Sequence, residues 1–210
     1  MAGWETVRFD DLESFPVGDD GLQWHPIRMR LGIGAFGMNA YTSEHVGGEV
    51  VEDHTEETYG HEEAYIVVSG HATFTLGGEE LDAPAGTIVF ISDPTVRRSA
   101  VALEEGTRVL AVGGKRGEAF EPSAWELFFR AKHFPPEEAL ALIEAADGYK
   151  VDELGYRYNL AVARVRAGRR AEAVEAFRQA YELDPERVAG HAATDARLDP
   201  IRDEVSAITG

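Results

Sequence analysis

The sequence contains no cysteine, and no apolar stretch approaches the roughly 20 residues that a membrane-spanning helix requires. The absence of cysteine excludes disulfide bonds, thiolate metal ligands and a cysteine nucleophile. The N-terminus also lacks the basic and apolar regions of a secretory signal, because charged and aromatic residues alternate there. The simplest predicted location is therefore cytoplasmic.

Positive charge is scarce as well. Among the 210 residues, 38 Asp and Glu stand against 20 Lys and Arg, which gives a net charge of −18 at pH 7. Such a surface repels the phosphate groups of nucleic acids and of anionic membranes. We therefore expect neither nucleic acid nor a membrane among the partners.

The first half of the chain has the pattern of an all-β domain. Short apolar or alternating segments are separated by glycine and proline, with turn signals about every 8 to 12 residues. Gly77 and Gly78 together predict a tight hairpin turn. The expected strands cover Ala35–Tyr41, Ala64–Val68, Ala72–Leu76, Thr87–Ile91 and Arg108–Val112.

The character of the chain changes near Gly113–Glu121, after which turns thin out and Ala, Leu, Glu and Arg dominate. Apolar residues recur there with the 3.6-residue period of a helix face. Pro185 follows the last of these segments and predicts its end. The expected helices cover Trp125–Lys132, Pro136–Ala146, Leu154–Ala167 and Arg170–Leu183.

The helical half also repeats itself. Ala173, Phe177 and Ala180 follow their counterparts Ala139, Ile143 and Ala146 by 34 residues, and Pro185 comes shortly after. This pattern resembles the tetratricopeptide (TPR) family. The resemblance implies a TPR-like domain over residues 121–210, with about two repeats (121–153 and 154–187) and an amphipathic capping helix at Asp199–Ile208. Its role is either to bind a protein partner or to stabilise the domain or its oligomer.

Two segments of the first half resemble the motifs of the cupin family. In His54–Gly70, Gly70 follows Glu63 after six intervening residues, as in the first cupin motif. In the second segment, the Pro84–Gly86 turn precedes an apolar strand and then a turn that contains Pro94. The resemblance covers roughly residues 35–113.

A cupin domain implies a double-sheet jelly-roll β-barrel with a small interior site. We place this domain at residues 1–116, so that the predicted fold class is α+β, a cupin barrel followed by the TPR-like segment. The family resemblance also implies a homodimer.

The resemblance assigns metal ligands one position at a time. Glu63 matches the glutamate of the first motif and His54 its first histidine, whereas Glu56 stands where the family has a second histidine. His61 lies two residues before Glu63, so both side chains share one face of a strand. His61 is therefore the predicted replacement for the missing histidine.

Arg97 occupies the place of the histidine of the second motif, counted from Gly86. Arginine has no lone pair for a metal, but its guanidinium can form two parallel hydrogen bonds with a carboxylate or phosphate. If Arg97 points into the barrel, alternation turns Arg98 outward. His71 is a further candidate to line the cavity, and alternation favours Ala72 equally.

Two interpretations of the site remain open. In one, a divalent ion (iron, zinc, manganese or nickel) is held by His54, His61, Glu63 and Glu56, while Arg97 faces an anionic ligand. In the other, the metal site is lost and Arg97 pairs internally with Glu63 or Glu56.

The first predicted function is a binding protein for a small anionic ligand, a divalent metal or both, whose TPR segment contacts a partner or a second copy. The alternative is a metal-dependent cupin enzyme, a dioxygenase, isomerase or lyase, acting on a small carboxylate-bearing substrate.

Overall fold

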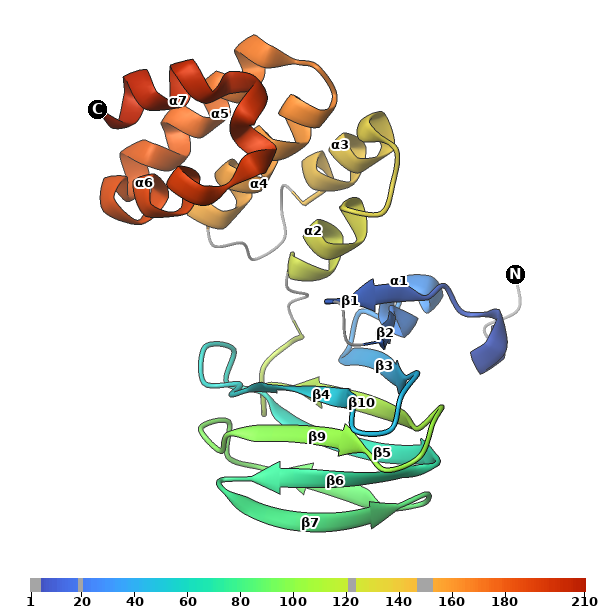
Figure 1. Cartoon of the computed structure of the whole chain (residues 1–210). Coiled ribbons are helices and arrows are strands. Elements are labelled where there is room, and N and C mark those ends of the chain that lie inside the picture. Colours follow the sequence, from blue (N-terminus) through green and yellow to red (C-terminus); the bar gives the residue numbers. More distant parts are fainter. Residues whose placement is uncertain (1–4, 19–20, 121–123, 147–152) are drawn as a thin grey trace. The chain divides into compact units, whose positions relative to one another are not determined.

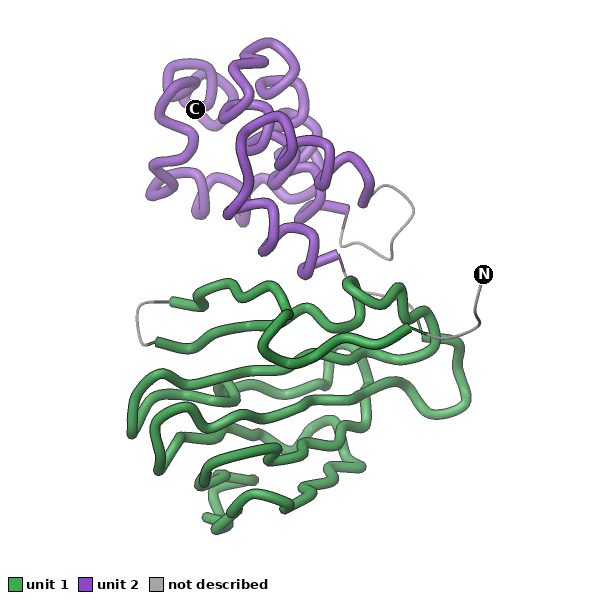
Figure 2. The backbone as a smooth tube through the Cα atoms, turned by 90° about the vertical axis from the view of Figure 1, so that its right-hand side faces the viewer, with its two compact units in different colours: residues 1–122 green, residues 123–210 purple. Residues whose placement is uncertain are grey.

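The computed structural model describes residues 5–18, 21–120, 124–146 and 153–210. It divides the chain into two compact units, residues 1–122 and 123–210 (Figure 2). The start of the predicted helical domain at residue 121 lies outside the described residues, as does the segment 147–152 just before the predicted junction between repeats.

The first unit is built from antiparallel strands in two sheets (Figure 1). One sheet has the order β1-β2-β3-β10-β5-β8, and the other has the order β4-β9-β6-β7. The strands are β1 (Phe15–Val17), β2 (Leu22–His25), β3 (Gly37–Ser43), β4 (Glu49–His54), β5 (Glu62–Ser69), β6 (His71–Leu76), β7 (Glu79–Pro84), β8 (Ile88–Ile91), β9 (Arg98–Ala102) and β10 (Arg108–Gly114). Two short helical segments, η1 (Phe9–Asp11) and α1 (Ile27–Leu31), accompany them.

One hydrophobic core joins the two sheets. Alternate residues of the strands point into it, such as Tyr65 and Val67 on β5 and Ala100 and Ala102 on β9. This is the alternation expected of strands with one face buried. The double-sheet antiparallel architecture predicted for this half of the chain is thus observed, and each of the five expected strands is present with shifted ends.

Two turns place the strands that carry the site. Gly77 and Gly78 both have positive φ in the hairpin between β6 and β7, as their sequence predicts. Gly70, between β5 and β6, combines a φ of +76° with a close approach, because a Cβ built there would lie 2.4 Å from Oγ1 of Thr107. Glycine is therefore required at position 70 for two reasons.

The second unit is helical, with α2 (Trp125–Ala131), α3 (Pro136–Glu144), α4 (Glu153–Arg166), α5 (Arg170–Leu183), α6 (Pro185–Thr194), the 3₁₀ segment η2 (Ala196–Ile201) and α7 (Arg202–Thr209). The residues that define the 34-residue period are buried: Ala139, Ile143, Ala146, Ala173, Phe177 and Ala180. Their burial agrees with a packed helical face, while the TPR assignment itself stays a prediction.

Pro185 does more than end α5. It stands in the first turn of α6, and the side chain of Asp184 caps that helix by accepting a 3.0 Å hydrogen bond from the backbone of Arg187. Sequence reasoning missed α6, although an Asp-Pro pair is a known start signal. The segment Asp199–Ile208 is helical, as the end of η2 followed by α7, while its role as the cap of a repeat stays a prediction. No helix among the described residues has the length and apolar composition needed to cross a bilayer.

Candidate functional site

The candidate site lies where β4 ends and where β5 and β9 begin. Arg98, the first residue of β9, is in register with His54, the last residue of β4. Glu63 is near the start of β5 and is in register with Gly113 of β10 and Ile91 of β8. Strand pairing therefore brings these side chains together although they are distant in the sequence.

Glu63 is held by its own strand. Tyr65, two residues later on the same inward face, donates a 2.5 Å hydrogen bond to Oε2 of Glu63. Gly113 leaves room for the glutamate, since a Cβ at that position would lie 2.9 Å from Cγ of Glu63. The side chain of Glu63 is only 13% exposed.

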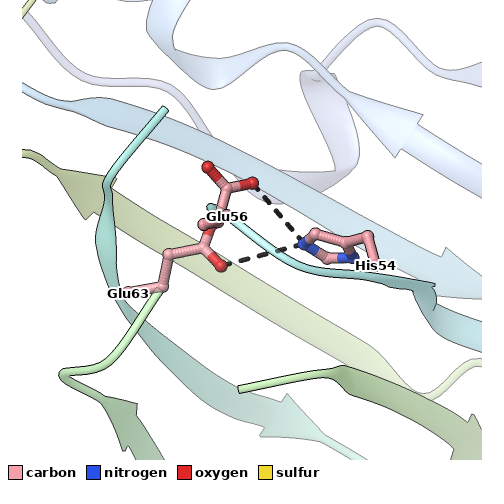
Figure 3. Close-up of side chains that lie close together, drawn as sticks. All are labelled: His54, Glu56 and Glu63. Atoms are coloured by element: carbon pink, nitrogen blue, oxygen red, sulfur yellow. Dashed lines mark ion pairs between the residues drawn. The ribbon is translucent and has the colours of Figure 1, made fainter. Parts of the chain in front are cut away.

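His54 presents its second ring nitrogen to two carboxylates. Nδ1 lies 2.7 Å from the carbonyl oxygen of Glu52, so the neutral tautomer protonated at Nδ1 leaves a lone pair on Nε2. Nε2 lies 3.6 Å from Oε1 of Glu56 and 3.9 Å from Oε2 of Glu63. Figure 3 shows the three side chains converging from different segments.

Glu56 is positioned by the loop between β4 and β5. Its backbone N–H donates to the carbonyl of Pro94, and its own carbonyl accepts from Tyr59 and Gly60, which closes a tight turn. Oε2 of Glu56 is buried and, among the described residues, has no hydrogen-bond partner. His61 approaches it to 3.1 Å without hydrogen-bonding geometry.

One donor atom from each of His54, Glu56 and Glu63 lies within 4.8 Å of the other two. Two ligand bonds of about 2.1 Å to one ion separate their donor atoms by at most about 4.2 Å. The 3.6 and 3.9 Å separations from Nε2 of His54 satisfy this limit, and the donor oxygens of Glu56 and Glu63 lie within 4.8 Å of each other. The predicted ligands His54, Glu56 and Glu63 are therefore brought together.

Electrostatics at the site favour a protonated His54 beside an ionised Glu63. Burial alone would lower the pKa of His54, but the adjacent Glu63 and Glu56 carboxylates and the carbonyl of Glu52 raise it above 6.5. Burial alone would raise the pKa of Glu63, but His54, Tyr65 and Arg98 hold it below 4.5. Burial and the Glu63 charge raise the pKa of Tyr65 far above its usual range, so its hydroxyl remains a donor.

The orientation predicted for Arg97 and Arg98 is wrong. Arg97, 66% exposed, forms a 2.6 Å ion pair with Asp53 and makes no internal pair with Glu63 or Glu56. Arg98 is completely buried, with Nε 3.8 Å from Oε2 of Glu63. The physical reason is strand phase, because Arg98 shares the inward face of Ala100 and Ala102 on β9.

His61 and His71 lie elsewhere than expected. His61 is outside the three-donor group, since it approaches only Glu56 and its ring stacks on Tyr59. His71 pairs with Asp82 of β7 at 2.7 Å. Ala72 takes the inward position in the core, so strand alternation turns His71 away from the cavity.

Sequence reasoning missed three residues that shape the site. Local spacing does not distinguish Arg98 from Arg97, because the buried face of β9, which Arg98 shares with Ala100 and Ala102, is set by packing into the core. Tyr65 lies in the expected strand Ala64–Val68, and the sequence gives no sign that its hydroxyl donates a hydrogen bond to Glu63. Gly113 carried no local signal, because its importance arises from the approach of a neighbouring strand.

Comparisons with known proteins give the following similarities. No protein-family model matches the chain. The uncharacterized protein SCO3923 of Streptomyces coelicolor is 27% identical over 109 residues, which are 51% of this chain and 93% of that protein.

Similar solved structures include KdgF from Halomonas sp., with 19% identity and a TM-score of 0.44 over 53% of this chain and 95% of that one. An RmlC-like cupin from Shewanella frigidimarina has 18% identity and a TM-score of 0.41, over 55% of this chain and 95% of its own. A sugar phosphate isomerase of the cupin superfamily from Silicibacter pomeroyi has 15% identity and a TM-score of 0.44, over 53% and 76%. Each of these similarities covers about half of this chain.

Proposed function

We propose that the β unit is a cupin-type barrel that binds one divalent metal ion through His54, Glu56 and Glu63 and presents it to a small ligand. The observation that carries the proposal is the convergence of three donor atoms from β4, the following loop and β5 within 4.8 Å. The primary role is binding, as a sensor or store of the metal, the ligand or both.

The donor set fits such an ion. One imidazole nitrogen and two carboxylate oxygens suit zinc, manganese, iron(II) or nickel. Oε2 of Glu56, which has no hydrogen-bond partner among the described residues, supplies a further buried oxygen that a cation would stabilise. The hydrogen bond from Tyr65 orients Glu63, as outer partners orient metal ligands in general.

The bound ion would leave coordination positions for water or a ligand, since only three protein groups converge here. Binding requires His54 to be neutral at Nε2, so uptake of the ion releases the proton that the raised pKa of His54 favours. In the absence of metal, that proton compensates part of the charge of the two glutamates.

Metal content and calorimetry test the proposal. The purified chain is analysed for first-row metals, and the chelator-treated chain is titrated with Zn²⁺ and Mn²⁺. We expect a stoichiometry of one, with an affinity loss of at least about 100-fold in Glu63→Gln and His54→Ala.

Two matched variants serve as controls. Glu62→Gln changes the preceding residue, which pairs with Arg116 instead of the site, and His71→Ala removes a histidine that pairs with Asp82. Both are expected to bind metal as the parent does. No saturable binding by the parent, or equal losses in Glu62→Gln and Glu63→Gln, would contradict the proposal.

A catalytic role is the second candidate, favoured by the grouping of three exchangeable groups. The hydroxyl of Tyr65 lies 2.5 Å from Glu63 and 3.5 Å from Nε2 of His54. In the metal-free site these three groups can exchange protons with a ligand, as isomerases and lyases of carboxylate-bearing substrates require; with an ion bound, His54 and Glu63 would hold it and the Tyr65 hydroxyl would remain the exchangeable group. A metal supplies polarisation of a substrate oxygen.

Deuterium incorporation separates this candidate from simple binding. A panel of small 2-hydroxy acids in D₂O is followed by proton NMR in the presence of the metal-loaded chain. Exchange at Cα that Glu63→Gln abolishes and Glu62→Gln retains supports catalysis. The absence of exchange across the panel contradicts a proton-transfer role.

A further inference from the structure

The guanidinium of Arg98 lies beside the proposed metal ligands but cannot itself bind a metal ion. Its side chain is 0% exposed and enters the barrel from the start of β9. Its strand neighbours are His54 on one side and Leu76 on the other. A buried positive charge at this place needs an acceptor.

The acceptors around Arg98 are insufficient. Nη1 donates a long 3.4 Å hydrogen bond to the carbonyl of Pro94. Nε and Nη2 are buried and have no hydrogen-bond partner within the part of the chain that the structure describes. Oε2 of Glu63 is 3.8 Å from Nε, which is too far for a hydrogen bond, and already accepts from Tyr65.

The two nitrogens that lack a hydrogen-bond partner, Nε and Nη2, lie on the same edge of the planar guanidinium. Their N–H groups are parallel and match the spacing of the two oxygens of a carboxylate. Because Nη1 on the opposite edge donates to the carbonyl of Pro94, the guanidinium plane is held with its Nε–Nη2 edge on the side away from that carbonyl. A carboxylate offers one oxygen to each N–H and also compensates the positive charge, whereas a neutral carbonyl brings no charge and a single-atom anion must share one acceptor between two N–H groups.

We propose that Arg98 binds the carboxylate of a small monocarboxylic acid inside the barrel, next to the metal ligands. This inference rests on the proposed function, because it names the chemical class of the ligand that the metal-binding barrel takes. The residue assigned to the acid group is thus Arg98, from the inward face of β9.

Charge balance favours a monoanion. Glu56 and Glu63 contribute two negative charges, Arg98 contributes one positive charge, and a divalent ion would contribute two more. The sum with neutral His54 is +1, which one carboxylate neutralises. A phosphate dianion would instead leave an uncompensated negative charge in a buried site, which is unfavourable.

The competing role for Arg98 is an internal counter-ion to Glu63. Both roles predict that Arg98 supports folding, so stability alone does not separate them. They differ in whether an added carboxylic acid reaches the guanidinium. The experiment therefore compares acids with neutral amides of nearly the same shape.

The probes are acetate and glycolate, with acetamide and glycolamide as their neutral counterparts. The full chain is labelled with ¹⁵N-arginine and titrated both after chelator treatment and after loading with Zn²⁺. We expect saturable movement of one Nε–H resonance with the acids only, and this resonance is absent in Arg98→Lys. Chloride at the same ionic strength is expected to have no effect.

Calorimetry with glycolate gives the size of the effect. Arg98→Lys keeps the charge but loses the parallel pair of N–H groups, so we expect affinity to fall by at least about tenfold. Arg97→Gln, the neighbouring arginine on the outer face, is the matched control and is expected to bind as the parent does. The titrations of the unaltered chain remain decisive if Arg98→Lys does not fold.

The outcomes separate the two proposals. Normal metal uptake with equal responses to acetate, acetamide and chloride overturns the carboxylate site and leaves the metal site standing. Acid binding that Arg98→Lys abolishes, in a chain that takes up no metal, supports Arg98 as the carboxylate site and overturns the metal proposal. Equal glycolate affinity in Arg98→Lys and the parent also overturns the assignment.

Discussion

The hydroxyl of Tyr65 donates a 2.5 Å hydrogen bond to Oε2 of Glu63, two residues earlier on β5. Both side chains point to the interior, because residues two apart on a strand share a face. The bond helps to hold the pKa of Glu63 below 4.5 despite its burial. It therefore links the core of the barrel to the candidate site.

Replacing Tyr65 by Phe removes this donor and leaves the ring. We expect the free energy of unfolding at pH 7 to fall by about 1.5–3 kcal/mol, because a buried carboxylate loses a charge-assisted hydrogen bond. The folded-state pKa of Glu63 is depressed, so its stabilising contribution is present above the unfolded pKa and is lost as pH falls through the folded value. Denaturant titrations should accordingly show the difference from the parent shrinking below about pH 4.5.

Tyr59→Phe is the control for this change, because the Tyr59 ring is largely exposed and stacks on His61. The free energy of unfolding of Tyr59→Phe is expected to stay within about 0.5 kcal/mol of that of the parent. A loss in Tyr65→Phe no larger than in Tyr59→Phe would show that the bond to Glu63 contributes nothing.

Gly113→Ala is expected to damage the site through sterics alone. The new Cβ would lie 2.9 Å from Cγ of Glu63, and the backbone of Gly113 does not have positive φ. We expect destabilisation of about 1–3 kcal/mol, typical of overpacking, together with weaker metal binding as Glu63 is displaced. Thermal unfolding and calorimetry measure the two effects.

The next residue on the same strand provides the comparison. At Gly114 the nearest atom to an added Cβ is 3.9 Å away, in the ring of Phe120. Gly114→Ala should therefore unfold and bind metal as the parent does. Equal behaviour of the two variants would contradict the close packing between Gly113 and Glu63.

The lowered pKa of His25, a residue outside the candidate site, predicts that the free energy of unfolding depends on pH. Burial and the charge of Arg108 lower its pKa below 6.5, against the raising effect of the carbonyl of Glu13. As pH falls below about 6.5, the unfolded state binds the proton first, so the free energy of unfolding decreases. His25→Gln should remove this part of the slope.

The free energy of unfolding is measured by denaturant titration from pH 7.5 to about 5 for the parent and His25→Gln. His45→Gln, which changes an exposed histidine, is the control. The raised pKa of His54 contributes a slope of opposite sign, stabilising at low pH, so only the difference between variant and parent isolates His25. If the free energy of unfolding of His25→Gln changes with pH in parallel with that of the parent, the lowered pKa of His25 is ruled out.

Truncation tests the independence of the two units. A chain ending at residue 120 contains every proposed metal ligand and the whole core between the sheets. We expect it to fold and to bind one metal ion with the affinity of the full chain. Loss of folding or of metal binding would assign the helices a structural role in the barrel.

Light scattering on the same two chains tests the predicted homodimer. A dimeric fragment places self-association in the barrel, and a dimer lost on truncation places it in residues 121–210. A monomer in both cases contradicts the prediction. The helical unit is then the candidate for contact with a different protein.

The helical half illustrates what local pattern can predict. The 3.6-residue period and the proline signals anticipated α2, α3, α4 and α5, and Ala173 and Phe177 are buried as expected of a packed helix face. Helix α6 was missed because Pro185 was interpreted only as a stop signal. The same proline begins the next helix when a capping Asp184 precedes it.

The sequence by itself determined five of the strands and three of the predicted ligands, since His54, Glu56 and Glu63 do converge. The tertiary structure decided which arginine enters. Arg97 and Arg98 are adjacent, and a shift of one residue in strand phase exchanges their faces. That phase depends on packing of Ala100 and Ala102 into a core built from both sheets, which no local spacing contains.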